Sequence, residues 1–239
     1  MGFETVARTH VGCRRKVNED AILARPELRL WAVADGMGGH HAGDVASARV
    51  IEALAQGAQG GDIQSRTSDV RQQLEATNAQ LRALASAGPE PKTIGSTVVA
   101  MVVEAGAFAC LWAGDSRIYL LRERSLIQLT RDHSLVQELV DLGEIDPADA
   151  RTHPNGNVIT RAVGADDRLE VDVVTGDVRP GDAFLLASDG LTRLLTDDEL
   201  LGGLRVDRLE SAADHLLETC LARGAPDNVS FVIVRVEAS

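Results

Sequence analysis

Short apolar runs rich in valine, isoleucine and leucine recur along the chain, and most are bounded by glycine, aspartate or serine. Runs of this length with such boundaries are typical of β-strands. The letters RERS at 122–125 lie between two of them and predict a hairpin. The pattern predicts strands at 28–35, 96–103, 107–114, 117–122, 125–130, 182–190 and 228–236.

Longer segments between these runs carry apolar residues at helical spacing. In the segment 67–87, Val70, Leu74, Leu81 and Leu84 fall on one face of a helix. The pattern predicts helices at 42–56, 67–87 and 207–223, and a shorter one at 134–142. Strands that follow one another along the chain form antiparallel sheets, and helices then cover the outer faces. We therefore predict an α+β fold, a layered sandwich of sheets and helices.

The composition narrows the class of protein. The 239 residues are enough for one domain with its own apolar core. A net charge of −12 and only 3% aromatic residues argue against a nucleic-acid partner. The three cysteines, Cys13, Cys110 and Cys220, form no C-x-x-C pair, which favours a reducing compartment over disulfides or a zinc site. With neither a signal-peptide core nor an apolar run of roughly 18 residues, we expect a soluble cytoplasmic protein without a membrane partner.

Acidic residues stand where predicted strands begin or end. A single Asp-Gly pair is usually only a turn. Several carboxylates placed in this way suggest a bound cation, because buried carboxylates repel one another unless something neutralises them. Oxygen ligands favour Mg²⁺ or Mn²⁺ over Zn²⁺. The residues concerned are Glu19, Asp20, Asp35, Asp115, Asp189 and Asp227, with Gly36, Gly190 and Asn228 beside three of them.

A series of motifs extends this picture over nearly the whole chain. In order, they are GCRRKVNEDA at 12–21, AVADGMGGHHAGDVAS at 32–47, GSTVVA at 95–100, AGDSRIYLLR at 113–122, LTRDHSLVQELVDLGEI at 129–145, HPNGNVITRAVG at 153–164, LLASDGLT at 185–192 and APDNVSFVIV at 225–234. Together they resemble the type 2C (PPM) metal-dependent serine/threonine protein phosphatases, in their bacterial form. The resemblance implies a four-layer α-β-β-α sandwich, with residues 1–239 forming one catalytic domain.

The resemblance also implies a role for each acidic residue. Asp35 would bridge two Mn²⁺ or Mg²⁺ ions, and the carbonyl of Gly36 would bind one of them. Asp189 and Asp227 would hold the first ion, with Asn228 orienting Asp227. Glu19 and Asp20 would face the second ion, directly or through water. Asp115 would share a third ion with Asp189. Arg15 would bind the substrate phosphate.

The implied chemistry is hydrolysis of phosphoserine and phosphothreonine in proteins by a water that bridges the metal ions, without a phosphoenzyme. Some family members carry a histidine after the Asp-Gly pair, where this chain has Met37. His40 and His41 follow, but we favour a bound water as the proton donor. The segment 135–161 resembles the family's flap, which lies beside the active site.

The resemblance further implies partners and leaves two alternatives. The expected partners are phosphoproteins made by a cognate serine/threonine kinase in a bacterial signalling system, and we expect a monomer. A catalytically weak binding module is one alternative, although such proteins usually lose metal carboxylates that this chain retains. A small-molecule phosphoesterase is the other, although GMGG at 36–39 lacks the lysine of a phosphate-cradling loop.

Overall fold

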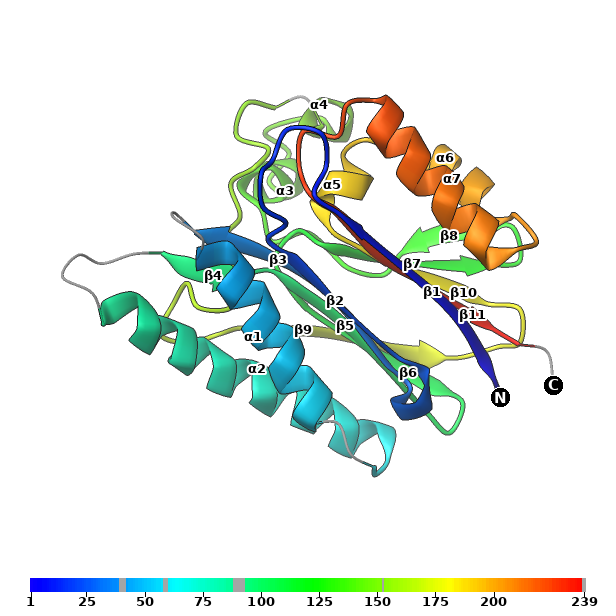
Figure 1. Cartoon of the computed structure of the whole chain (residues 1–239), viewed down its shortest axis with the longest axis horizontal. Helices are drawn as coiled ribbons and strands as arrows, with labels where there is room; N and C mark the ends of the chain where they lie inside the picture. The colour runs from blue at the N-terminus through cyan, green and yellow to red at the C-terminus, as the bar shows by residue number, and fades with distance from the viewer. Residues whose placement is uncertain (39–41, 58–59, 88–92, 152, 238–239) are drawn as a thin grey trace.

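The computed structural model of the chain describes residues 1–38, 42–57, 60–87, 93–151 and 153–237. Two antiparallel sheets lie face to face (Figure 1). The first sheet has the order β1 (Phe3–His10), β11 (Val229–Val236), β10 (Ala183–Ala187), β7 (Arg117–Arg122), β8 (Ser125–Gln128). The second has the order β2 (Asp20–Arg25), β3 (Leu30–Gly38), β5 (Val98–Glu104), β6 (Ala107–Ala113), β9 (Asp172–Asp177), and β4 (Ile94–Ser96) also pairs with β3.

Helices cover the outer face of each sheet. Helices α1 (Ala42–Gly57) and α2 (Ile63–Ser86) pack on the second sheet, and α6 (Asp197–Leu204) and α7 (Leu209–Ala222) pack on the first (Figure 1). The predicted α+β fold, a four-layer α-β-β-α sandwich, is therefore confirmed.

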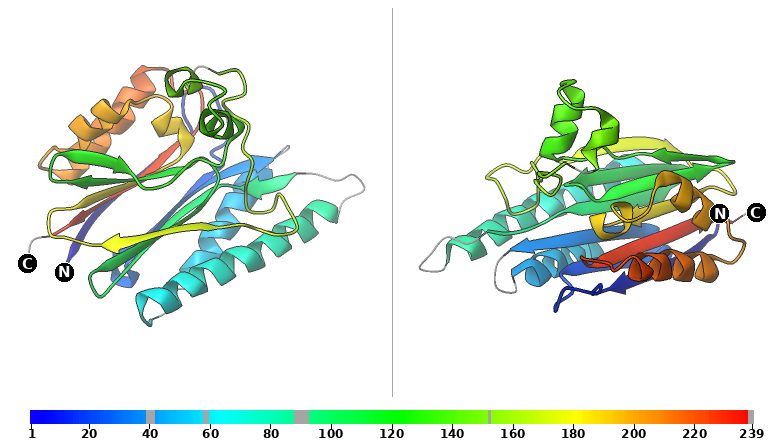
Figure 2. Two further views of the ribbon diagram at one scale, coloured as in Figure 1. Left: turned by 180° about the vertical axis from the view of Figure 1, so that it is seen from behind. Right: turned by 90° about the horizontal axis from the view of Figure 1, so that it is seen from above.

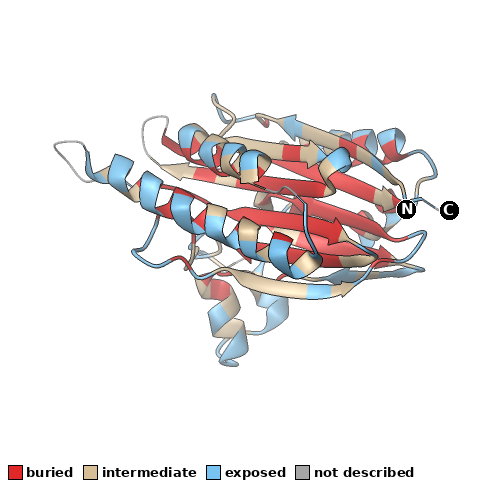
Figure 3. Ribbon diagram, turned by 90° about the horizontal axis from the view of Figure 1, so that it is seen from below, coloured by how far each residue is buried: buried red, intermediate tan, exposed pale blue. Residues whose placement is uncertain are grey.

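The layers follow from strands that are buried on both sides. In β3, Trp31 and Val33 face the layer between the sheets, whereas Ala32 and Ala34 face helix α1. The same division separates Phe184 from Leu185 in β10. Two buried faces make every position of a central strand apolar, so these strands read as continuous hydrophobic runs and are red along most of their length in Figure 3.

The strands missing from the sequence prediction share one property. β1, β2 and β9 each lie at the edge of a sheet, and β4, which the predicted strand at 96–103 did not separate from β5, pairs with β3 alone among the described strands. Edge strands are covered less completely and carry more polar residues, so their apolar pattern is weak. In β1, Val6 is buried and the other residues of Phe3–His10 are partly or fully exposed.

Helix α6 was also missed, although its start carries a recognisable signal. Thr196 and Glu199 form a capping box, in which each side chain accepts a hydrogen bond from the other residue's backbone N–H. Helix α2 begins earlier than predicted because the side chain of Asp62 caps it by accepting from the N–H of Ser65.

The segment predicted to be a flap projects at one end of the sandwich (Figure 2). It contains the short helices α3 (Leu135–Asp141) and α4 (Pro147–Ala150). Ser134 caps α3, in agreement with the predicted helix at 134–142. A further short helix, α5 (Asp189–Thr192), follows β10, and the 3-10 turn η1 (Pro26–Leu28) joins β2 to β3.

Candidate active site and metal centre

Asp35 lies inside β3 and not at its end, so the predicted end of that strand was wrong. The strand continues because Gly36 to Gly38 pair with β4 after the preceding residues have paired with β2 and β5. The N–H of Asp35 donates to the Thr97 hydroxyl at 3.2 Å, and its carbonyl accepts from the Ser96 hydroxyl at 3.0 Å. The last residue of β4 and the residue after it therefore hold Asp35 in place, at the point where β3 stops pairing with β5 and begins to pair with β4.

Asp20 lies directly opposite Asp35 in the antiparallel pairing of β2 with β3. Side chains of directly opposed residues leave the same face of a sheet. Oδ2 of Asp20 accepts a hydrogen bond from the Ser188 hydroxyl at 2.9 Å. Its other oxygen, Oδ1, is buried and has no hydrogen-bond partner among the described residues.

Asp189 is the first residue of α5, so the predicted strand at 182–190 ended too late. The chain leaves β10 at Ala187 and turns into the helix at Ser188. The following Gly190 is packed tightly, because a Cβ atom there would lie 1.8 Å from the backbone oxygen of Asn228. The glycine lets the turn after β10 approach the start of β11, and this approach brings Asp189 near Asp227.

Asn228 connects β11 to the loop that precedes β2. Its Oδ1 accepts from the N–H of Glu19 at 2.8 Å, and its Nδ2 donates to the carbonyls of Val11 and Val17 at 2.9 and 3.0 Å. The side chain is only 4% exposed. The contact of Asn228 with Asp227 runs through its backbone N–H, 2.9 Å from Oδ1 of Asp227.

Glu19 and Gly36 share a corner with the start of α1. The N–H of Gly36 donates to the carbonyl of Glu19 at 3.0 Å. A Cβ atom on Gly43 would lie 2.6 Å from Oε1 of Glu19 and 2.8 Å from the carbonyl oxygen of Gly36. The carboxylate of Glu19 and this carbonyl therefore face the same small space. His40 and His41 lie outside the described residues.

Burial and mutual repulsion raise the pKa values of the clustered carboxylates. Burial raises the pKa of Asp20 to about 7, with further increases from Asp189 and Asp227. Burial and then the charge of Asp20 raise the pKa of Asp35 well above its ordinary value. Burial likewise raises the pKa of Asp189, and that of Asp115 to about 7. Mutually raised pKa values are expected where several carboxylates share a site that a cation would neutralise.

The donor set fits a hard divalent ion that keeps part of its water shell. Within the described ranges, no three His, Cys, Asp or Glu side chains come close enough together to enclose an ion by themselves. Mg²⁺ does not need such a cage, because it binds through one or two carboxylates and retains several waters. The unpartnered Oδ1 of Asp20 is an oxygen ligand of this kind.

Arg15 lies at the edge of this group of carboxylates. Its Nη2 is 2.8 Å from Oδ2 of Asp227, and half of its side chain is exposed. The hydrogen bond to Asp227 raises the pKa of Arg15, and the charges of Glu19 and Asp35 act in the same direction. An exposed guanidinium beside a metal site is well placed to bind a phosphate in bidentate fashion.

Asp115 follows β6 and is only 6% exposed. It lies apart from Asp20 and is joined to Asp189 through Arg193. Nε of Arg193 is 2.7 Å from Oδ2 of Asp189, and its Nη2 is 3.3 Å from Oδ2 of Asp115. Sequence reasoning did not single out Arg193, because an arginine after a short helix carries no pattern of its own.

A cavity of about 710 Å³ lies between these residues and the flap. Asp115, Asp189 and Arg193 line one side, and Val136, Arg151 and Gly156 of the flap line the other. The predicted flap segment thus borders the candidate site.

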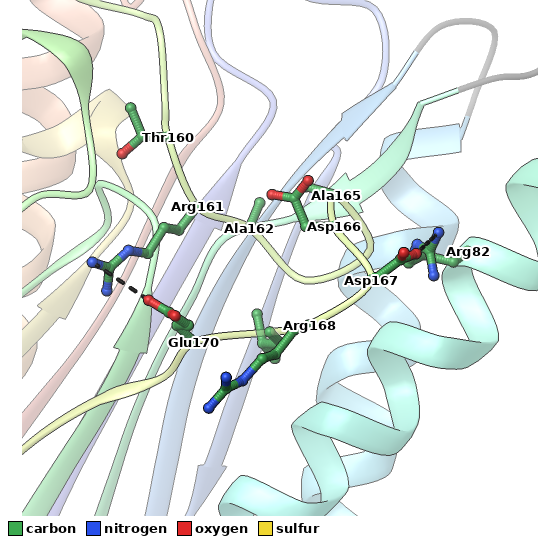
Figure 4. Close-up of a pocket in the computed structure, with 10 residues that line it drawn as sticks. Arg82, Thr160, Arg161, Ala162, Ala165, Asp166, Asp167, Arg168 and Glu170 are labelled. Carbon is green, nitrogen blue, oxygen red and sulfur yellow. Dashed lines mark ion pairs between the residues drawn. The ribbon is translucent and has the colours of Figure 1, made fainter.

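A second hollow, of about 550 Å³, lies under the segment 160–170 (Figure 4). Four of its charged side chains form two ion pairs, Arg82 with Asp167 and Arg161 with Glu170. None of the carboxylates of the candidate site lines it. We therefore place the chemistry at the carboxylates and not in this hollow.

Comparison with known proteins agrees with this architecture. The family model Protein phosphatase 2C matches residues 12–229. The serine/threonine protein phosphatase PstP of Mycobacterium tuberculosis is 38% identical over 233 residues, which are 96% of this chain and 44% of PstP. The serine/threonine phosphatase stp of Listeria monocytogenes is 35% identical over 235 residues, 95% of this chain and 93% of that protein.

A crystal structure of the catalytic domain of PstP in complex with two manganese ions superposes with a TM-score of 0.88, at 36% identity and 99% coverage of both chains. The chain belongs to the protein phosphatase 2C family, as its motifs predicted. It spans less than half the length of the mycobacterial relative that it matches. No helix in the described part of the chain is long and apolar enough to cross a membrane.

Proposed function

We propose that this protein is a metal-dependent serine/threonine protein phosphatase. The observation that carries the proposal is the convergence of four aspartates from separate parts of the chain, with an unpartnered oxygen on Asp20. They are Asp20 in β2, Asp35 in β3, Asp189 in α5 and Asp227 in the loop before β11. Carboxylates gathered in this way are costly without a cation. The manganese ions of PstP and the activities for which PstP and stp are named support the same reading.

In this proposal Asp35 would serve both ions, and the carbonyl of Gly36 would bind one of them. Asp189 and Asp227 would hold the first ion, and Asp20 with Glu19 would hold the second, directly or through water. Bound divalent ions supply a water of lowered pKa and neutralise developing charge on the phosphoryl oxygens. Asp115 and Asp189 together form the candidate site for a third.

The chain's own side chains bind and orient the phosphate. The guanidinium of Arg15 neutralises the oxygens that face solvent, as charge-assisted hydrogen bonds do in phosphoryl transfer. Asn228 holds the loop 11–19 against β11 and so keeps Arg15 and Glu19 in place. No serine or cysteine nucleophile is required, so no phosphoenzyme is expected.

We further propose phosphoproteins, made by a cognate serine/threonine kinase, as substrates. We also propose that residues 1–239 act as one catalytic domain that is monomeric and cytoplasmic. The absence of a C-x-x-C pair in the sequence supports the reducing compartment.

The test is hydrolysis of p-nitrophenyl phosphate and a phosphothreonine peptide with Mn²⁺, with Mg²⁺ and with EDTA. We expect activity with either metal and none with EDTA, and no activity in Asp189→Asn. Asp177→Asn, at the exposed end of β9, is the matched control and should behave as wild type. Activity in EDTA or in Asp189→Asn would refute the mechanism. Equal rates on nucleotides and peptides would refute the protein substrate.

A further inference from the structure

The guanidinium of Arg193 makes four contacts that connect two parts of the molecule. On one side it contacts Asp189 at 2.7 Å and Asp115 at 3.3 Å. On the other side its Nη2 donates to the carbonyl of Gly156 at 2.7 Å, and its Nη1 donates to the side chain of Asn157. One side chain therefore joins the two carboxylates to the flap.

Arg151 makes the reciprocal connection from the flap. Its Nη2 donates to the carbonyls of Thr192, Arg193 and Leu195 at 3.2, 3.1 and 2.7 Å. The flap and the turn after α5 are thus held by two arginines that point in opposite directions. Among the contacts between described residues, Arg193 reaches carboxylates and Arg151 reaches only carbonyl groups, so mutation can separate the two roles.

The position of Arg193 bears on cation binding. Asp115 is almost fully buried and Asp189 is 18% exposed, so both carboxylates need a positive partner. Arg193 supplies one positive charge in a planar fork that suits two carboxylates. A divalent ion between the same carboxylates would compete with Arg193 for their negative charge and for the Oδ2 atoms that the guanidinium contacts.

We propose that Arg193 is the resident cation of the Asp115–Asp189 pair, and that a further divalent ion binds there only by displacing it. When Arg193 is displaced, it loses its ion pairs with Asp115 and Asp189. The loop at Gly156 and Asn157, which Arg193 joins to these carboxylates, is then held less firmly. Binding of a divalent ion at this position and attachment of the flap by Arg193 therefore oppose one another. The inference rests on the proposed metal roles of Asp115 and Asp189.

The first experiment counts Mn²⁺ ions by equilibrium dialysis with detection of free Mn²⁺ by electron paramagnetic resonance. In Arg193→Met, we expect the weakest binding step to tighten by about two- to fivefold, the value of a partly exposed ion pair. Arg193→Gln, which keeps polar contacts to the flap without the charge, should show the same change. Arg193→Lys, which keeps the charge but not the planar fork, should tighten this step less than either neutral variant does.

Arg151→Met is the matched control, because it removes the hydrogen bonds from the flap to the turn after α5 without changing the contacts of Asp115 and Asp189. It should leave the tighter Mn²⁺ steps at wild-type affinity and should tighten the weakest step less than Arg193→Met does, because it removes only the flap's share of the coupling. In the double variant Asp115→Asn with Arg193→Met, the tightened step should disappear. Its persistence there, or an unchanged weakest step in both Arg193→Met and Arg193→Gln, would overturn the proposal.

The second experiment follows hydrogen exchange of residues 153–161 as Mn²⁺ is raised. In wild type, exchange should accelerate over the concentrations that fill the weakest site. In Arg193→Met it should be fast already and insensitive to Mn²⁺. A wild-type loop that is equally protected at every Mn²⁺ concentration would contradict the coupling. Loss of the tighter steps in every variant, wild type included, would instead refute the proposed metal centre.

Discussion

Asp20 and Asp35 lie directly opposite one another across β2 and β3, so that two half-buried carboxylates leave the same face of one sheet. Like charges in this relationship destabilise a sheet. The register of β2 and β3 places these two carboxylates opposite one another, whereas the other paired residues of the two strands are mostly apolar. The folded state is therefore destabilised by electrostatic repulsion at this position, unless protons or a cation neutralise the carboxylates.

The first prediction is that the metal-free protein loses stability as the pH rises. Burial raises the folded-state pKa of Asp20 and of Asp115 to about 7, whereas an unfolded aspartate has a pKa of about 3.9. The folded state binds more protons between these values, so the contribution of these two groups to stability is full below about pH 4, falls between about pH 4 and pH 7 and is lost above about pH 7.

Thermal unfolding in EDTA between pH 5 and pH 8 measures this effect, and the melting temperature should decrease across the range. Added Mn²⁺ should raise the melting temperature more at pH 8 than at pH 5, because the ligands must be deprotonated. A melting temperature in EDTA that rises with pH would contradict the raised pKa values.

The second prediction concerns Asp189→Asn, which removes a charge from this group. In EDTA the variant should melt at or above the wild-type temperature, because one of the mutually repelling carboxylates is gone. Its kcat/KM with Mn²⁺ should fall by at least about 100-fold, since even residues that only support a ligand are worth 10 to 100-fold. A variant that is unstable in EDTA would show that Asp189 has a structural role instead.

The third prediction concerns Asn228→Ala. The change leaves the N–H of Glu19 and the carbonyls of Val11 and Val17 without their partner. Each buried group left unsatisfied costs about 1–3 kcal/mol, so we expect a loss of roughly 2–5 kcal/mol in the free energy of unfolding. Urea denaturation measures it, and a loss below about 0.5 kcal/mol would contradict the role of this side chain.

The fourth prediction compares two glycines. Gly190→Ala places a Cβ atom 1.8 Å from the backbone oxygen of Asn228, so the turn must shift. We expect a loss of about 1–3 kcal/mol in stability and weaker Mn²⁺ binding. Gly202→Ala is the control, because a Cβ there meets nothing within 4 Å inside helix α6. It should stabilise the protein by about 0.5–1 kcal/mol.

The fifth prediction separates phosphate binding from metal binding. Arg15→Ala should lower kcat/KM for a phosphothreonine peptide by about 10 to 100-fold, the value of a charge-assisted hydrogen bond. Its affinity for Mn²⁺ should not decrease, because the change frees Oδ2 of Asp227. Steady-state kinetics and Mn²⁺ titration test this together. A matched loss of Mn²⁺ affinity would place Arg15 in the metal site's support and not in phosphate binding.

The central strands could be predicted because burial on both faces makes them apolar at every position. The edge strands β1, β2 and β9 could not, since one partner or one covering layer is missing and their polar residues obscure the pattern. The end of β3 was misplaced because Asp-Gly usually marks a turn, whereas here Gly36 pairs with β4 and the strand continues.

By itself, the sequence determined the family, the layered fold class and the chemical kind of the site, because these depend on ordered motifs, on apolar runs and on the presence of carboxylates. The tertiary structure alone decided which side chains meet. Asp20 faces Asp35 through strand register, Asp189 reaches Asp227 where Gly190 packs on Asn228, and Arg193 joins Asp115 to the flap. Periodicity records which face of an element is buried, but the partner on that face is set by packing between residues far apart in the chain.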